Sequence, residues 1–504
     1  MKRVLIIILC FASFACYAQN RNSVWVFGDS AGIDFTILSN PIPISSGMDG
    51  RGSCVSISDS IGNLIFYSYT QANTGDWSTL IHSNLNTLIQ NGDSITGAAW
   101  YNELTIIPWT KDSNKYFLFS CGLDAPNNEG LYYSIVDMNL NNGLGSVALK
   151  NIQLNPNEIA DCLTAVKHGN GRDWWLISKL SNATTTYNNR FLKYLIVGDS
   201  IFNYAYQDFN DARDGDFQKI IWNSSNDKFM LINTLGYMSE YNFDRCSGTI
   251  SFFRNIFIEQ SSNYSRLFWE GAYSPSGDIF YVSTNYWFNV DTAFLLQLNL
   301  LSPDIAGTID TLERFVDPIG TGAPRLAPDG KIYFSRPYLY GFPGFPYPDS
   351  VRNNINENLS VIHSPDSLGA SCNYQPFSFY LGGKRTYYGL PNNPNYDLGP
   401  LTGSVCDTLT VGISNNEQRI LNGELTIFYH ASWKTAFINA KQLKGKIANL
   451  SVYNITGQLI FQSSKNIYDG YFTFDLDMQP FADGLYIVNL QSERETLVKK
   501  FVKQ

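Results

Sequence analysis

The chain is poor in histidine and in charged residues for its length. Among 504 residues it has four histidines, and Lys, Arg, Asp and Glu together make up 16%. Aromatic residues reach 15%, and glycines number 39. This balance is typical of an all-β extracellular protein rather than a helical one. The formal net charge of −9 makes nucleic acid and anionic membrane surfaces poor partners.

The motifs of the common hydrolases and nucleotide enzymes are missing. The sequence contains no GxSxG, HExxH or P-loop pattern. The segment Phe27–Ala31 imitates the first block of the GDSL hydrolases, whose nucleophilic serine needs a histidine base with an aspartate three residues ahead of it. The residues three positions ahead of His82, His168, His363 and His430 are Thr79, Ala165, Ser360 and Ile427. We therefore predict no catalytic residue and interpret Phe27–Ala31 as a β-turn.

No metal or other cofactor is predicted. The acidic segment Asp208–Asp216 offers oxygen ligands for calcium, but Ile221 stands where EF-hand spacing needs a bidentate glutamate, so we interpret it as a solvated turn. Thr110–Phe117 loosely resembles an Asp-box turn of sialidase-type propellers. A sialidase would repeat that turn over several blades and gather arginines at the centre, so a structural turn is preferred. Glycoside hydrolysis by two facing carboxylates stays open.

No apolar run beyond the N-terminus approaches the length of a membrane span. At the N-terminus, Lys2-Arg3 precedes the apolar run Val4–Ala15, and small residues follow. This pattern predicts a signal peptide over residues 1–18, cleaved between Ala18 and Gln19. The alternative is a lipoprotein acylated on Cys16, which Ser13 disfavours because a lipobox usually has leucine there. We expect an exported mature chain with no transmembrane span.

The mature chain retains six cysteines, and none of them forms a CxxC pair. This excludes a zinc ribbon and a thioredoxin-like motif. An oxidising compartment permits disulfides, but six cysteines allow 15 connectivities, so the pairing stays open. A bridge from Cys406 to Cys372 is one of the possibilities. The six residues are Cys54, Cys121, Cys162, Cys246, Cys372 and Cys406.

A turn followed by a strand is the unit that the chain repeats. In Ala327–Ser335, Pro-Asp-Gly supplies a tight turn, and Lys-Ile-Tyr-Phe-Ser reads as a strand. The same pattern appears at Ser274–Ser283 and Asp59–Tyr67, and more loosely at 112–119, 168–177 and 223–232. The copies lie roughly 50–56 residues apart, which indicates propeller blades rather than a helical solenoid.

We predict a seven-bladed β-propeller over residues 19–395. The count combines the six copies with a further region around Gly383, which the N-terminal strand Ser23–Gly28 is expected to close. The turns at Gly62, Gly277 and Pro328 should then occupy equivalent positions in their blades. Most aromatic rings should fill the space between blades, although stacking on sugars is an alternative. Trp174 and Trp175 are adjacent on a strand, so one of them is expected to face solvent.

The composition changes after residue 395. Residues 396–424 are rich in Gly, Pro, Asn and Ser with little periodicity, which indicates a linker. Residues 425–504 contain short alternating strands, and about 80 residues of this kind suit a small β-sandwich. The predicted fold is therefore all-β, with a propeller followed by a C-terminal sandwich.

Several segments are similar in order to a propeller region common in surface proteins of the type IX secretion system. They are Trp25–Phe35, Gly62–Tyr67, Tyr133–Met138, Pro328–Tyr333 and Gly389–Asn392. The resemblance spans about Ser23 to Asn395. It implies a secreted or outer-membrane cell-surface protein that travels through the periplasm.

The C-terminal segment resembles the type A sorting domain of the same secretion system. Val452–Gly457, Ala482–Val488 and the basic end Lys499–Lys503 carry the match. The family usually places an Asn-Pro turn after its first strand, whereas this chain reads Phe428–Trp433 without proline. The resemblance implies that residues 425–504 engage the type IX secretion machinery.

The tripeptide Asp-Ser/Thr-aliphatic or Ala recurs more often than composition explains. It occurs nine times, against about two expected. It resembles the O-glycosylation acceptor of bacteria that carry type IX secretion, and it is also ordinary turn chemistry. The predicted acceptors are Ser30, Ser60, Ser94, Ser200, Thr292, Thr311, Ser350, Ser367 and Thr408.

Two functions remain in competition. The first is a non-enzymatic binding or adhesion module with a surface glycan or protein as ligand, and the second is a propeller-based glycan-active enzyme. The central channel should discriminate between them. Three or more converging acids and arginines would favour the enzyme, and an apolar or mixed polar lining would favour the binding module.

Overall fold

The computed structural model describes most of the chain in two compact units, one ending at Thr410 and the other beginning at Val411. The described residues are 20–71, 78–97, 101–122, 130–181, 189–210, 215–258, 267–284, 292–339, 347–407, 424–431, 433–455, 457–468, 470–493 and 496–503. Within them, no helix is long and apolar enough to cross a membrane. The predicted cleavage site, Ala18 and Gln19, lies outside the described residues.

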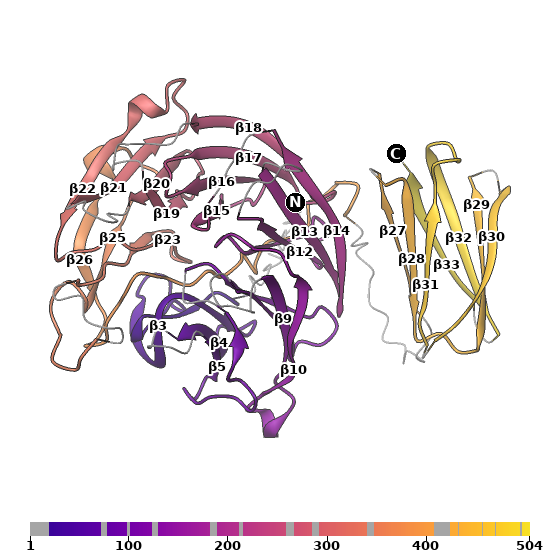
Figure 1. Ribbon diagram of the computed structural model, residues 1–504, viewed down its shortest axis with the longest axis horizontal. Helices are drawn as coiled ribbons and strands as arrows, with labels where there is room; N and C mark the ends of the chain where they lie inside the picture. The colour runs from indigo at the N-terminus through magenta and orange to yellow at the C-terminus, as the bar shows by residue number, and fades with distance from the viewer. Residues whose placement is uncertain are drawn as a thin grey trace, which may run out of the picture. The chain divides into compact units, whose positions relative to one another are not determined.

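Five four-stranded antiparallel sheets make up most of the first unit. In each sheet the strands follow one another in sequence order, from the centre of the ring outward (Figure 1). The first contains β7 (Leu104–Pro108), β8 (Lys115–Gly122), β9 (Gly130–Asp137) and β10 (Ser146–Asn155). The second contains β11 (Thr164–Lys167), β12 (Trp174–Lys179), β13 (Asn189–Val197) and β14 (Ser200–Phe209). The third contains β15 (Gln218–Trp222), β16 (Lys228–Asn233), β17 (Met238–Asp244) and β18 (Thr249–Phe257). The fourth contains β19 (Phe268–Tyr273), β20 (Ile279–Thr284), β21 (Thr292–Asn299) and β22 (Asp310–Val316). The fifth contains β23 (Pro324–Leu326), β24 (Ile332–Phe334), β25 (Asn358–Ile362) and β26 (Tyr374–Tyr380).

The remaining six strands of the propeller form two blades, which share the long strand β3 (Ile42–Ser58). They are β1 (Val24–Phe27), β2 (Asp29–Asp34), β3, β4 (Leu64–Gln71), β5 (Ser78–Ser83) and β6 (Ile95–Thr96). The first half of β3 pairs with β2 and the second half, from Gly50, pairs with β4. Strand β3 is therefore the outer strand of one blade and the inner strand of the next. The propeller has seven blades, as predicted.

The ring does not close as the sequence suggested. The N-terminal strand β1 pairs with β2, and the last blade takes all four of its strands, β23 to β26, from residues 324–380. The first blade instead pairs at Asp29 with Arg385, in the segment that follows the last blade. The backbone N–H groups of Asp29 and Arg385 donate to each other's carbonyls at 2.8 and 3.1 Å, and their side chains form an ion pair.

The repeated turns occupy equivalent positions, as predicted. Gly62, Gly277 and Gly330 each lie in the turn between the first and second strand of a blade. Their φ angles of +99°, +81° and +78° lie in the region that glycine adopts without strain. At the first of these turns, Asp59 Oδ1 accepts hydrogen bonds from the backbone N–H groups of Ile61 and Asn63, both at 2.9 Å.

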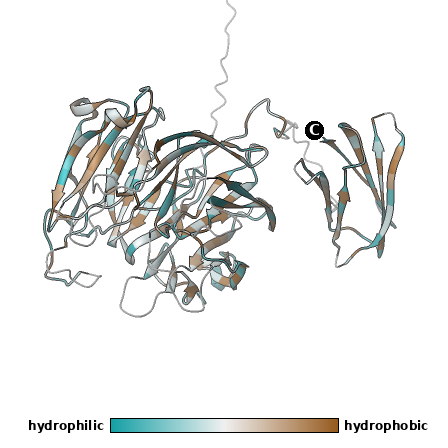
Figure 2. Cartoon of the chain, turned by 45° about the horizontal axis from the view of Figure 1, so that its top comes forward, coloured by the Kyte–Doolittle hydropathy of each residue, from teal (hydrophilic) through white to brown (hydrophobic). Residues whose placement is uncertain are grey.

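The core lies between neighbouring blades, and apolar residues fall on the strands of both units (Figure 2). The prediction that Trp174 or Trp175 faces solvent is wrong, since the two are 1% and 0% exposed. In a propeller both faces of a blade are covered by the adjacent blades. Trp175 Nε1 donates to the Arg245 carbonyl at 2.8 Å, and its ring fills the space over Gly248, where a Cβ atom would lie 2.6 Å from the ring.

The segment Tyr388–Asp407, which we name the channel strap, runs from the propeller centre to its rim (Figure 1). Tyr388 O accepts from Ala323 N (3.0 Å) and Ser335 Oγ (2.6 Å), at the N-terminal ends of the inner strands. Tyr396 donates to the Ile106 carbonyl at 3.1 Å, and Leu401 N donates to Gly169 O at 2.8 Å, toward the opposite ends.

The prediction of a linker over residues 396–424 is therefore wrong for residues 396–407, which contact the propeller. Tyr396 is fully buried and packs on Trp174 with ring centroids 5.8 Å apart. Aromatic burial of this kind outweighs the linker-like composition around it. A disulfide joins Cys406 to Cys246, while Cys372, the partner considered from sequence, is buried and free, as are Cys54, Cys121 and Cys162.

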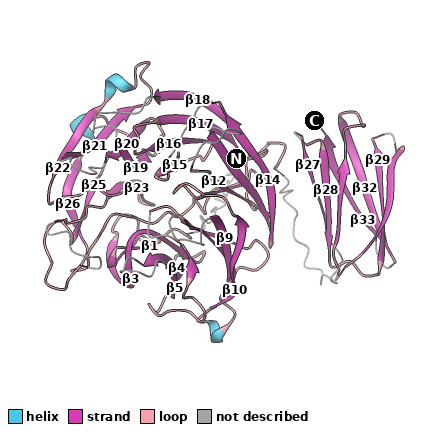
Figure 3. Cartoon of the chain, viewed as in Figure 1, coloured by secondary structure: helices cyan, strands magenta, loops and turns pink. Residues whose placement is uncertain are grey.

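The second unit is a β-sandwich, and it contains no described helix (Figure 3). One sheet has the order β27-β28-β31 and the other β30-β29-β32-β33. Both sheets contribute to one apolar core, for example through Ile438 and Leu450. The strands are β27 (Glu424–His430), β28 (Thr435–Lys441), β29 (Ile447–Asn454), β30 (Leu459–Asn466), β31 (Phe472–Asp477), β32 (Gly484–Ser492) and β33 (Thr496–Lys503). Short 3-10 turns occur only in the propeller among the described residues, at Asn141–Gly143, Ala306–Thr308 and Gly369–Cys372.

The turn between β27 and β28 closes without the Asn-Pro pair of the sorting-domain family. The ring of His430 stacks on Trp433 with centroids 4.4 Å apart, and Trp433 N donates to His430 Nδ1 at 3.1 Å. Lys434 adopts a positive φ of 51°. A ring stack and a side-chain hydrogen bond thus hold this turn.

Candidate binding site in the central channel

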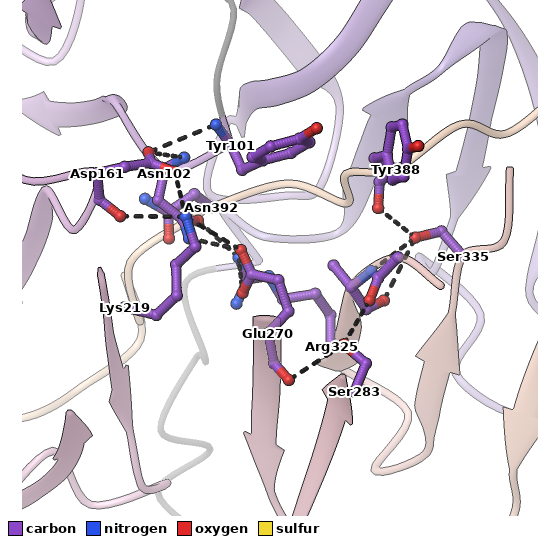
Figure 4. Close-up of polar contacts among 12 residues, drawn as sticks. Tyr101, Asn102, Asp161, Lys219, Glu270, Ser283, Arg325, Ser335, Tyr388 and Asn392 are labelled. Atoms are coloured by element: carbon purple, nitrogen blue, oxygen red, sulfur yellow. Dashed lines mark hydrogen bonds and ion pairs between the residues drawn. The ribbon is translucent and has the colours of Figure 1, made fainter. Parts of the chain in front are cut away.

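Charged and polar side chains from several blades meet in the channel (Figure 4). They lie near the N-terminal ends of the inner strands. Lys219 belongs to β15, Glu270 to β19 and Arg325 to β23, while Asn102 and Asp161 come just before β7 and β11. Inner strands converge on the propeller axis, so residues that are far apart in sequence become neighbours here.

The charges form one closed network. Lys219 makes an ion pair with Asp161 and lies 3.8 Å from Glu270, and Arg325 lies 3.4 Å from Glu270. Asn102 links both ends: its Nδ2 donates to Glu270 at 2.7 Å, its Oδ1 accepts from Arg325 at 2.7 Å, and its backbone N–H donates to Asp161 at 2.6 Å. Two cations and two carboxylates therefore balance one another.

This network is buried. The side chains of Lys219, Asp161 and Glu270 are at most 2% exposed, and the Lys219 ammonium lies 5.5 Å from the ring centre of Tyr101. A buried charge is tolerated only when it is paired and hydrogen-bonded. Each ion of the network meets this condition, which makes the network a support of the inner strands.

A third carboxyl group, Glu103, lies beside the network. Thr70 Oγ1 donates to its Oε1 at 2.8 Å. Burial, with the neighbouring Asp161 carboxylate, raises the pKa of Glu103 well above its usual value. The neutral acid is therefore favoured at Glu103, and the network keeps its balance of two positive and two negative charges.

A cavity of about 470 Å³ opens beyond the network. The ends of the inner strands form one part of its wall, and the channel strap and the first described residues form another. Its charged lining residues are Arg325 and Asp397. The other lining residues are Asn20, Asn22, Ser23, Phe35, Thr36, Leu38, Thr164, Ile220, Ile221, Trp222, Asn223, Ser224, Asn226, Gly271, Ala272, Tyr273, Leu326, Ala327, Pro328, Pro391, Asn392, Asn393, Pro394 and Asn395.

The motifs considered from sequence lie elsewhere. In the segment that imitates a hydrolase block, Asp29 is held by Arg385, and Ser30 Oγ lies 3.4 Å from the Asp29 carboxylate. In the Asp-box-like segment, Asp112 Oδ1 accepts from Asn114 N at 3.1 Å, inside the β7–β8 turn. Both segments have a structural explanation, and neither reaches the channel cavity.

The acidic segment 208–216 is described only in part, because residues 211–214 lie outside the described residues. Asp208 is paired with Arg190 through two hydrogen bonds of 2.7 and 2.6 Å. Within the described ranges, no three His, Cys, Asp or Glu side chains group as a metal site would require.

The proposed glycosylation acceptors differ in exposure. Ser60, Ser94, Thr311 and Ser350 are exposed. Ser30, Ser200, Thr292 and Ser367 are half-buried, and Thr408 lies outside the described residues. The exposed hydroxyls meet the steric requirement for modification, which itself stays a prediction.

None of the residues of the charged network was predicted from the sequence. One signal was available, because Lys219 and Glu270 are charged residues in mainly apolar strands that directly precede a repeated turn. Such positions are inner-strand positions once the repeat is recognised as a propeller blade. The pairing of Lys219 with Glu270 could not be predicted from the sequence, since it depends on how the blades converge.

The C-terminal unit matches a known family. Residues 433–504 match the family model of the secretion system C-terminal sorting domain. The chain thus carries a type IX secretion sorting domain, which supports export to the cell surface or the medium. The first strand of the sandwich, β27, precedes the matched range.

No curated protein matches the chain. Among solved structures, the periplasmic gluconolactonase PpgL of Pseudomonas aeruginosa has 8% identity and a TM-score of 0.34, covering 79% of this chain and 94% of that one. TolB from Acinetobacter baumannii has 11% identity and a TM-score of 0.29, covering 63% and 62%. Apo AztD from Citrobacter koseri has 12% identity and a TM-score of 0.34, covering 73% and 86%. Scores this low carry no information about what the chain binds.

Proposed function

We propose that the chain is an exported surface protein whose propeller binds a ligand non-covalently and catalyses no reaction. The observation that carries this proposal is the lining of the channel cavity. Amides, hydroxyls and apolar side chains make up nearly all of it. A concave site with a few fixed polar groups is the usual form of a ligand-binding site.

The position of the carboxylates supports binding over catalysis. A general acid or base must lie within hydrogen-bond reach of the substrate. Glu103, Asp161 and Glu270 do not line the cavity, and Asp161 and Glu270 are occupied by Lys219 and Arg325. Both acids are at most 2% exposed, so neither is accessible to a ligand in the cavity.

A glycan-active enzyme is the second candidate, because one observation favours it. Three acids converge with Lys219 and Arg325 at the channel centre, which satisfies the count expected of an enzyme. The pKa of Glu103 is raised well above its usual value beside Asp161, and carboxyl groups with separated pKa values serve glycoside hydrolases. This candidate requires the network to open before a substrate could reach it.

The test is an array of glycans and surface proteins probed with the full chain. We expect saturable binding to at least one ligand, which is recovered chemically unchanged after long incubation. Glu103→Gln serves as the matched variant, since it keeps the shape of the side chain. Product formation that disappears in Glu103→Gln would replace the binding proposal with the enzymatic one.

The proposed route to the surface uses both ends of the chain. A signal peptide over residues 1–18 would deliver the chain to the periplasm, and the sorting domain would engage the secretion machinery for the second step. The family match supports this second step. Adhesion through the propeller would follow at the outer-membrane surface.

A further inference from the structure

The Asn22 side chain presents a fixed hydrogen-bond donor to the channel cavity. Ser56 N donates to Asn393 Oδ1 at 2.9 Å, so Asn393 Nδ2 is the end that donates to Asn22 Oδ1 at 2.8 Å. Trp25 Nε1, which can only donate, also reaches Asn22 Oδ1, at 3.1 Å. The amide cannot be reversed without losing both bonds. Its Nδ2 has no partner among the described residues and is left for the cavity that Asn22 lines.

Asn392 presents a fixed acceptor in the same way. Its Nδ2 donates to the carbonyls of Leu104 and Leu163 at 3.2 and 2.9 Å. Carbonyls only accept, so this orientation is also determined. Asn392 Oδ1 is left without a partner within the described part of the chain, and the residue lines the cavity.

Thr164 adds a second donor to the cavity wall. Its Oγ1 accepts from Trp222 Nε1 at 2.9 Å, and both residues line the cavity. The hydroxyl hydrogen of Thr164 therefore remains available to a ligand. Donors and an acceptor are thus fixed in one cavity before any ligand arrives, which lowers the entropic cost of binding.

The charge of the cavity is balanced. Arg325 is paired with Glu270 at 3.4 Å and also donates to Asn102. Asp397 interacts electrostatically with Lys167. Because both charged lining residues already have opposite charges nearby, a charged ligand gains little here and loses its hydration.

We infer that the cavity binds a neutral carbohydrate, an inference that rests on the proposed binding function. Sugar hydroxyls donate and accept at the same atom, so neighbouring hydroxyls of one ring satisfy donors such as Asn22 and Thr164 together with the acceptor Asn392. The volume of about 470 Å³ lies within the usual range of roughly 300–1,000 Å³ for small-ligand sites.

The experiment measures binding of the full chain to three kinds of oligosaccharide by calorimetry. The neutral probes are cellotetraose and chitotetraose, the anionic ones are sialyllactose and tetragalacturonate, and the cationic one is a glucosamine tetramer. Asn22→Asp keeps the oxygen that accepts from Trp25 and Asn393 but replaces the donor with an anionic acceptor. We expect this variant to bind the two neutral probes about tenfold more weakly and to shift its preference toward the cationic probe.

Asn142→Asp is the matched control, because it makes the same chemical change at an exposed residue away from the cavity. It should leave binding unchanged. Thr164→Val replaces the hydroxyl with a methyl group of nearly the same size and should weaken binding of the neutral probes about three- to tenfold. This second variant tests the inference if Asn22→Asp does not fold.

Several outcomes would overturn the inference. Preference of the wild type for anionic probes would do so, as would equal effects of Asn22→Asp and Asn142→Asp. Binding of a surface protein but of no glycan would contradict the carbohydrate inference and would still support the proposed binding function. Cleavage of a neutral probe would instead contradict the non-enzymatic function and would still support a neutral carbohydrate as the ligand.

Discussion

At the scale of single residues, burial decides which charges the propeller tolerates. Lys219 and Asp161 are nearly inaccessible and form an ion pair, so removing the Lys219 side chain alone would leave Asp161 as a buried carboxylate without its cation. Lys167 is a different case. It is 8% exposed, its ammonium lies 5.5 Å from the ring centre of Trp174, and burial lowers its pKa to about 8.

The pKa of Lys167 predicts a pH dependence of stability. An unfolded lysine titrates near 10.4, so between about pH 8 and 10.4 the unfolded chain binds more protons than the folded one. Stability conferred at this site therefore rises with pH across that window. Relative to Lys167→Met, the wild type should gain about 2 kcal/mol in unfolding free energy between pH 7.5 and 9.5, measured by urea denaturation.

The comparison with Lys167→Met cancels the titration of groups that do not interact with Lys167. The charges near Lys167 are Asp397, Arg21 and Arg245. Burial lowers the pKa of Arg245 to about 10, so the measurement stops at pH 9.5, below that value. Lys150→Met, at an exposed pair with Asp93, controls for loss of a surface lysine. An unchanged or falling difference between wild type and Lys167→Met would contradict the assigned burial.

At the scale of elements, the channel strap connects the propeller centre to its rim. Arg245 Nη2 donates to Gly399 O at 2.7 Å, and Leu401 N donates to Gly169 O at 2.8 Å. The Cys246–Cys406 disulfide then closes a sequence separation of 160 residues. Cross-links over long separations typically contribute about 2–5 kcal/mol.

We predict that the disulfide protects the end of the channel strap. In the double variant Cys246→Ala/Cys406→Ala, thermolysin should cut near Leu398 and Leu401 at least about tenfold faster, because the hydrogen bonds at Gly399 and Leu401 hold this stretch only weakly. Tyr396 is fully buried and should keep the segment before it protected. Mass spectrometry of the fragments locates the cuts.

Cys372→Ala is the control for this measurement, since Cys372 is free and buried in another blade. It should leave the cleavage pattern unchanged. Cleavage that begins within the blades of the double variant, while Leu398 stays protected, would mean that the disulfide stabilises the ring and not the strap.

At the scale of the whole molecule, two units with separate cores divide the work. The sandwich core comes from residues between Leu425 and Phe501, and the blades have their own cores. A unit with its own core can fold without its neighbour. The sorting match lies entirely in the second unit.

We predict that deleting residues 424–504 leaves a folded propeller that stays in the periplasm. The circular dichroism spectrum and the thermal transition of the propeller should persist, because its blades keep all their strands. Cell fractionation decides the location. Deletion of residues 1–18 is the control and should hold the chain in the cytoplasm, whereas normal surface levels of the truncated chain would refute the sorting role.

Much of the fold could be predicted because turn chemistry is local. Gly62, Gly277 and Gly330 marked the same turn in three blades, since a glycine with positive φ between two strands needs no distant partner. The sandwich was equally readable from short strands of alternating apolar and polar residues, and burial alternates accordingly, as in β28. The candidate site was not predictable, because Lys219 and Glu270 acquire their roles from residues of other blades.

The sequence by itself determined the all-β class, the blade repeat, the sorting domain and the absence of the common catalytic motifs. These depend on patterns within a few residues or on a linear motif. Only the tertiary structure decided that Cys406 pairs with Cys246, that Tyr396 is buried and that Asn22 and Asn392 line one cavity. Closing the ring brings residues more than 300 positions apart into contact, as in the bond from Ser56 to Asn393, and no local pattern encodes such a distance.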